Sequence, residues 1–184
     1  MSLVTMREIL PYAEEKKIAI PAFNIDTMEI TQAILETVEE ENCPAIIAVG
    51  QAAIKDGKLE SLAATVRTLA KDMKTPVVLH LDHGQSVEQV VKALCAGFTS
   101  VMIDGSKLSF EDNIAVTQEV VRIANAAGAS VEAELGAILG SEDNISHDDS
   151  KPFLVRVQDV IDFTAAVKVC LLYTSPSPRD KRQS

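Results

Sequence analysis

The stretch PVVLHLDHGQS, residues 76–86, begins as an apolar run and then places two histidines and an aspartate within four positions. Its short Val- and Leu-rich core, bounded by Pro and Gly, is typical of a buried β-strand. Because side chains alternate along a strand, His80 and Asp82 share one face, while Leu79 and Leu81 share the other. The stretch therefore predicts a strand whose carboxyl end carries polar chemistry.

Similar short runs recur on both sides of this strand, and the segments between them have helical spacing. Asp26 and Ser109 are predicted to cap helices, and Gly97 and Gly128 fit just past helix ends. The pattern is strand, helix, strand throughout, which requires parallel strands with right-handed crossovers. The other predicted strands are IAIPAFNI (18–25), PAIIAVG (44–50), SVMIDGS (100–106) and SVEAELG (130–136).

The alternation of strands and helices is compatible with a doubly wound sheet or with a (β/α)₈ barrel, and the spacing of the strands bears on the choice. Strand starts advance by about 28 residues, so eight units would need roughly 225 residues or more, near the usual barrel length. The 184 residues are too few for that. We expect an α/β fold, a (β/α)₈ TIM barrel truncated after about five βα units.

The last residues, 170–184, differ in character from the rest of the chain. CLLYTSPSPRDKRQS loses the helical periodicity and is rich in Ser, Pro and Arg. Its first eleven residues are compatible with a translated transposase sequencing adapter, although a natural flexible tail remains an alternative. We therefore predict two parts: residues 1–169 as barrel and residues 170–184 as a non-native tail, excluded from fold reasoning.

Composition limits the classes of partner. The formal net charge of −10 disfavours nucleic acid and anionic membranes, and a small metabolite is the expected partner, with a local basic pocket for phosphate still possible. No apolar run approaches the roughly 18 residues of a membrane span, and the N-terminus lacks the order of a signal peptide. The three cysteines are widely spaced and form no disulfide or zinc pattern. A cytoplasmic globular protein is expected.

Polar residues stand at the ends of four of the five predicted strands. Asn24, Asp82, Asp104 and Glu134 would all face the C-terminal mouth of a barrel, where barrel enzymes carry out chemistry. Each alone could be a capping carboxylate or a satisfied buried polar group. Their occurrence at equivalent positions favours a site.

The three histidines differ in expected role. His83, beside Asp82, is either a metal ligand or a structural hydrogen-bonding group. His80 lies deeper in its strand, so a supporting hydrogen bond is expected. His147 lies in a polar loop and is assigned no role.

The segments PAFNI, HLDHG, SVMIDGS and VEAELGAILGSEDN, in this order, resemble the N-terminal part of a class II, metal-dependent ketose-bisphosphate aldolase. This family includes fructose- and tagatose-bisphosphate aldolases, and the resemblance covers about residues 3–169. By the resemblance, His83 matches the first histidine ligand of the catalytic zinc. Asp104 and Glu134 match carboxylates at a second or alternative metal position.

The resemblance also implies catalytic and substrate-binding roles. Asp82 matches the acid/base that handles the aldehyde oxygen, Glu142 matches a loop glutamate that moves the substrate proton, and Asn24 matches a substrate-contacting asparagine. Zn²⁺ would act as a Lewis acid that stabilises an enediolate, which makes a lysine Schiff base unnecessary. A carboxylate on the loop at 137–157 could then remove a proton.

The implied reaction is the reversible cleavage of a ketose 1,6-bisphosphate to dihydroxyacetone phosphate and an aldehyde such as glyceraldehyde 3-phosphate, within carbohydrate metabolism and glycolysis. The family's two further histidine ligands and its glycine-rich phosphate turns are missing here, and GQAA at 50–53 lacks a small hydroxyl residue. We therefore expect an incomplete, inactive fragment of an enzyme that is a homo-oligomer when complete. A noncatalytic barrel subunit assisting a partner aldolase, or another metal-dependent barrel lyase, are the alternatives. Fructose and tagatose substrates are not separated by the sequence.

Overall fold

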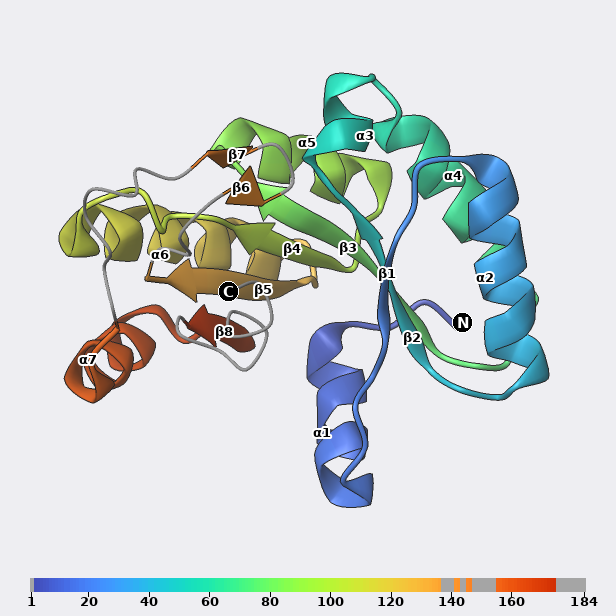
Figure 1. Cartoon of the computed structure of the whole chain (residues 1–184), viewed down its shortest axis with the longest axis horizontal. Helices are drawn as coiled ribbons and strands as arrows, with labels where there is room; N and C mark the ends of the chain where they lie inside the picture. The colour runs from blue at the N-terminus through green and yellow to red at the C-terminus, as the bar shows by residue number, and fades with distance from the viewer. Residues whose placement is uncertain (1, 137–140, 143–144, 147–154, 175–184) are drawn as a thin grey trace.

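The computed structural model of the chain describes residues 2–136, 141–142, 145–146 and 155–174. Its core is a curved, six-stranded parallel sheet in the order β1-β2-β3-β4-β5-β8 (Figure 1). The strands are β1 (Ala22–Asn24), β2 (Ala45–Val49), β3 (Val77–Gly84), β4 (Ser100–Ile103), β5 (Ser130–Leu135) and β8 (Leu171–Thr174). All five predicted strands are confirmed, although β1 is shorter than the run that predicted it.

Helices connect the strands and cover the outer side of the sheet, except α1 (Met6–Lys16), which precedes the first strand (Figure 1). The other helices are α2 (Met28–Glu40), α3 (Gln51–Lys55), α4 (Leu59–Ala70), α5 (Val87–Ala96), α6 (Phe110–Ala126) and α7 (Val157–Val167). The longer helices α2, α4, α5, α6 and α7 pack on one another in chain order, as expected when every crossover has the same hand. Among the described residues, no helix is long and apolar enough to cross a membrane.

The helix ends follow the predicted capping residues with one exception. Ser109 caps α6 and accepts a hydrogen bond from the Asp112 amide, and Gly97 ends α5 with a φ of 95°. The prediction that Asp26 caps α2 is wrong: Thr27 is the cap, because it has the extended backbone and its hydroxyl accepts from the Ile30 amide.

The two faces of the sheet have different partners. On β2 and β3, Ile47 and Leu79 are fully buried in the main apolar cluster beneath the outer helices. The alternate residues Ile46 and Val78 face inward and pack with Met6 of α1 in a second cluster. Helix α1 therefore covers the inner face near the amino ends of the strands, and the carboxyl ends are left for other residues.

Two features lie beyond the five predicted units. Strands β6 (Ser141–Glu142) and β7 (Ile145–Ser146) form a short antiparallel pair within the predicted loop. Strand β8 pairs in parallel with β5, with Glu132 opposite Leu171, so the backbone of the first residues of the predicted tail continues the sheet. Consecutive Leu and Tyr residues beside an open sheet edge favour such pairing.

Candidate metal centre and active site

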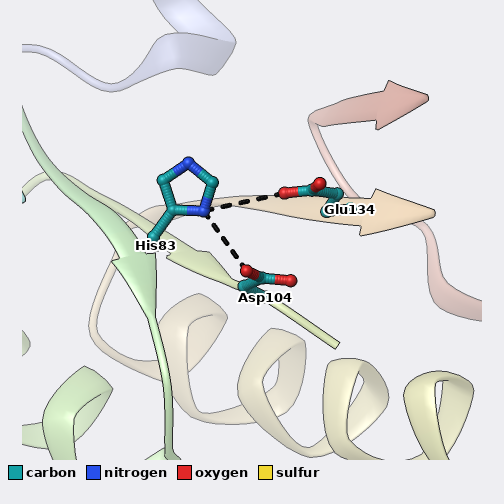
Figure 2. Close-up of side chains that lie close together, drawn as sticks. All are labelled: His83, Asp104 and Glu134. Carbon is teal, nitrogen blue, oxygen red and sulfur yellow. Dashed lines mark hydrogen bonds and ion pairs between the residues drawn. The ribbon is translucent and has the colours of Figure 1, made fainter. Parts of the chain in front are cut away.

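Three predicted residues meet at the carboxyl ends of neighbouring strands (Figure 2). His83 lies on β3, Asp104 directly follows β4, and Glu134 lies on β5. The His83 Nδ1 atom is 3.3 Å from Asp104 Oδ2 and 3.7 Å from Glu134 Oε2. Asp104 and Glu134 lie beside each other at the ends of their strands. Ile103, the last residue of β4, pairs with Ala133, so the next residues along the two segments are Asp104 and Glu134.

The backbone at His83 departs from a regular strand. Strict alternation would put its side chain on the outer face with Leu79 and Leu81. Instead, the pairing of β3 with β4 shifts register between Leu81 and Gly84, and His83 has a left-handed φ of 50°. The imidazole thereby reaches the inner side, where it lines the same hollow as His80.

Gly84 makes this irregularity possible. A Cβ atom at this position would lie 2.4 Å from the carbonyl oxygen of Met102, closer than any side chain tolerates. Because β4 approaches β3 so closely here, only glycine fits the position after His83.

The carboxylates around His83 set its charge. Burial lowers the pKa of His83, but the hydrogen bond to Asp104 and the charges of Asp82 and Glu134 outweigh it and raise that pKa to about 9. Burial raises the pKa of Asp104, whereas hydrogen bonds from His83 and Ser106 bring it down to about 2. The carboxylates that favour a proton on His83 would also favour a bound cation, which would displace that proton when the imidazole coordinates it.

Asp82 and Asn24 lie beside this cluster. They line an inward-facing hollow of about 570 Å³ together with His83 and the buried His80. Asp82 Oδ1 is 4.0 Å from His83 Nε2. The side-chain ends of Asn24 and Asp82 both lie near Gly50, just after β2. A Cβ atom added to Gly50 would be 3.9 Å from Asn24 Nδ2 and 4.0 Å from Asp82 Oδ2.

His80 has the supporting hydrogen bond that its position predicts, to Ser100, and a close contact with Glu132. Its Nδ1 atom is 3.0 Å from Ser100 Oγ, and its Nε2 atom is 3.3 Å from Glu132 Oε2. Burial lowers the pKa of His80 to about 3, and burial together with the charge of Asp82 raises the pKa of Glu132 to about 7. Sequence reasoning missed Glu132, although its position two residues before Glu134 puts it on the same face of β5.

For two residues singled out from the sequence, Glu142 and His147, the structure does not describe the side chain. The backbone of Glu142 belongs to β6, but its side chain lies outside the described residues. His147 lies outside the described residues altogether.

The three clustered residues fit a divalent metal ion. His83, Asp104 and Glu134 each offer one ligand atom, and these atoms lie within 4.8 Å of one another. Imidazole nitrogen and carboxylate oxygen bind Zn²⁺ at about 2.0–2.2 Å, which puts neighbouring ligand atoms of a tetrahedral site roughly 3.4 Å apart. The distances from His83 Nδ1 to Asp104 Oδ2 (3.3 Å) and to Glu134 Oε2 (3.7 Å) lie just below and just above that value.

Curated proteins of similar sequence are named as aldolases. A probable fructose-bisphosphate aldolase of Bacillus subtilis is 47% identical over 148 residues, covering 79% of this chain and 52% of the relative. A fructose-bisphosphate aldolase of Thermus caldophilus is 45% identical over 157 residues, covering 85% of this chain and 51% of the relative. The chain thus spans about half the length of the curated relatives it matches.

Solved structures show the same fold. The YdjI aldolase of Escherichia coli K12 superposes with a TM-score of 0.81 at 28% identity, over 92% of this chain and 61% of that one. A putative fructose-1,6-biphosphate aldolase of Coccidioides immitis gives 0.80 at 31% identity, over 94% and 63%. Residues 4–175 match the family described as Fructose-bisphosphate aldolase class-II. With its parallel α/β sheet forming part of a TIM barrel, this chain belongs to the class-II fructose-bisphosphate aldolase family.

Proposed function

We propose that a protein containing this chain at the full length of its relatives is a zinc-dependent aldolase. It would reversibly cleave a ketose 1,6-bisphosphate, of fructose or tagatose type, to dihydroxyacetone phosphate and an aldehyde such as glyceraldehyde 3-phosphate. The observation that carries the proposal is the cluster of His83, Asp104 and Glu134 at the carboxyl ends of three adjacent strands. In barrel enzymes this end holds the chemistry.

Each residue near the cluster has a defined task in this proposal. Zn²⁺, when bound, supplies Lewis-acid polarisation of the substrate oxygens. Asp82 is in reach of a reacting oxygen in the hollow and exchanges a proton with it, while Asn24 hydrogen-bonds the substrate beside it. Glu142, on the β6–β7 pair, takes the proton from the substrate carbon.

The 184-residue sequence supplies only part of that machinery. A catalytic zinc site has three protein ligands and an open position. The described residues contain two histidines, His80 and His83; His80 contacts Ser100 and Glu132, and His83 is the one at the cluster. We therefore propose that this chain alone binds zinc weakly and does not turn over substrate.

The remaining expectations are proposals of the same kind. We place the complete enzyme in the cytoplasm as a homo-oligomer. We also propose that residues 170–184 are not native to the barrel, since their sequence resembles an adapter translation. Sequencing the source gene past the codon for Val169 tests this, and an uninterrupted match to CLLYTSPSPRDKRQS contradicts it.

The test of function uses the gene product extended to family length. Fructose and tagatose 1,6-bisphosphates are supplied separately, and release of dihydroxyacetone phosphate is coupled to NADH oxidation. Activity that a chelator abolishes and Zn²⁺ restores is the expected result. Chelator-resistant cleavage contradicts the zinc assignment, and absence of cleavage with either sugar favours a noncatalytic barrel.

A further inference from the structure

The left-handed backbone at His83 needs a structural explanation. A φ of 50° is uncommon for a residue with a side chain and costs of order 1 kcal/mol or more unless its surroundings hold it. The same residue sits where β3 loses its regular pairing with β4, so the strand ladder does not fix it. The imidazole nevertheless has to stay opposite Asp104 and Glu134.

A buried amide contacts the backbone at this point. Gln51, at the start of α3, is only 1% exposed. Its Nε2 donates to the carbonyl oxygen of His83 at 2.8 Å and to Gln89 Oε1 at 3.1 Å. Both amide hydrogens of Gln51 are therefore used, one of them on His83 itself.

Gln89, on α5, connects this contact to the segment after His83. Its Oε1 also accepts from the backbone amide of Gln85 at 2.9 Å, and its Nε2 lies 3.4 Å from Gln51 Oε1. The two amides thus link α3, α5 and the turn that leaves β3. None of these atoms belongs to the cluster of ligand atoms.

We propose that Gln51, braced by Gln89, is a positioning residue for the metal centre. It holds the peptide that follows His83, and so keeps the imidazole turned inward toward Asp104 and Glu134. This inference rests on the proposed role of His83 as a metal ligand. Its physical basis is that a buried polar group left without its partner is costly, so the amide and the carbonyl fix one another.

The expected effect is on metal affinity more than on folding. Groups that orient metal ligands change affinity by about 10- to 100-fold when removed. Since Gln51 acts through the backbone of His83, we expect the lower end for Gln51→Met, about tenfold weaker Zn²⁺ binding. Gln89→Met, which leaves the direct contact in place, should weaken binding by a few-fold.

The chain contains a matched control. Gln118 also donates from Nε2 to a backbone carbonyl, that of Ala166, at 3.1 Å, between α6 and α7. Gln118→Met makes the same chemical change away from His83. Zn²⁺ affinity of the 184-residue chain is measured by competition with a chromophoric chelator, and the metal-free variants are compared by urea unfolding and by the imidazole ¹H–¹⁵N resonances of His83.

Three results decide the matter. Weaker Zn²⁺ binding and shifted His83 resonances in Gln51→Met, with neither change in Gln118→Met, support the proposal. Equal affinity in the two variants overturns it, even if Gln51→Met is less stable. If Gln51→Met does not fold, Gln89→Met decides by the same comparison, whereas failure of the unmutated chain to bind Zn²⁺ through His83 counts against the metal site itself.

Discussion

Raising the pH from 7 to 9 should destabilise the metal-free chain chiefly by deprotonating His83. In the folded state its pKa is raised from 6.5 to about 9 by the surrounding carboxylates. A group with a raised folded pKa stabilises the fold fully below its unfolded pKa, and this stabilisation is lost as pH rises through the folded pKa. The relevant window is therefore pH 6.5 to 9.

The size of the effect follows from that difference. At 1.36 kcal/mol per pH unit, the whole shift corresponds to about 3 kcal/mol, of which about 2 kcal/mol is lost between pH 7 and 9. The side chain is only 13% exposed, so screening by water is limited. The titrations of His80 and Glu132, with pKa values of about 3 and about 7 in the folded state, fall mostly below this window.

The assay is urea unfolding with a chelator present, at half-unit steps of pH, for the wild type and His83→Gln. Burial also raises the pKa of the Cys170 thiol, which lowers stability at the alkaline end, but both proteins share that effect. The difference between them should fall by about 2 kcal/mol between pH 7 and 9. Parallel stability curves over this range would refute the charge assignment at His83.

Three substitutions test the close approach of β3 and β4, the acid/base group and the metal ligands. Gly84→Ala should destabilise the chain by roughly 2–3 kcal/mol in urea unfolding, because the added Cβ atom would lie 2.4 Å from the Met102 carbonyl oxygen. An unchanged urea midpoint would show that β3 and β4 can separate freely. In the family-length enzyme, Asp82→Ala should lower kcat by about 10²- to 10⁴-fold with near-normal metal content, and loss of the metal would make Asp82 a ligand or its support. Asp104→Asn should weaken Zn²⁺ binding by about tenfold or more and lower the pKa of His83 measured by NMR titration, whereas retention of both values would remove Asp104 from the site.

The sequence predicts the strands well because their signals are local. A parallel strand buried on both faces is a short apolar run between breakers, and the runs of β2 to β5 have that form, whereas β1 is exposed in this structure. The position of Asp104 and Glu134 could also be predicted, since equivalent ends of parallel strands meet at one edge of the sheet. The cap of α2 could not be assigned from the sequence, because Asp26 and Thr27 are adjacent and both can cap a helix; the structure shows the Thr27 hydroxyl accepting from the Ile30 amide.

The finer geometry of the site depends on contacts between distant segments. Period-two alternation places His83 on the wrong face, because the bulge depends on how closely Met102 approaches Gly84. The same holds for Gln51, whose role appears only when α3 is seen packed against the end of β3. Glycine after the histidine was the available sequence signal for this irregularity.

Anomalous diffraction from crystals of the protein grown with Zn²⁺ would locate the zinc directly. We expect a peak about 2.0–2.2 Å from an imidazole nitrogen of His83, at the cluster formed with Asp104 and Glu134. A protein that binds zinc tightly while this cluster shows no anomalous signal, with the peak at other residues, would contradict this placement of the zinc.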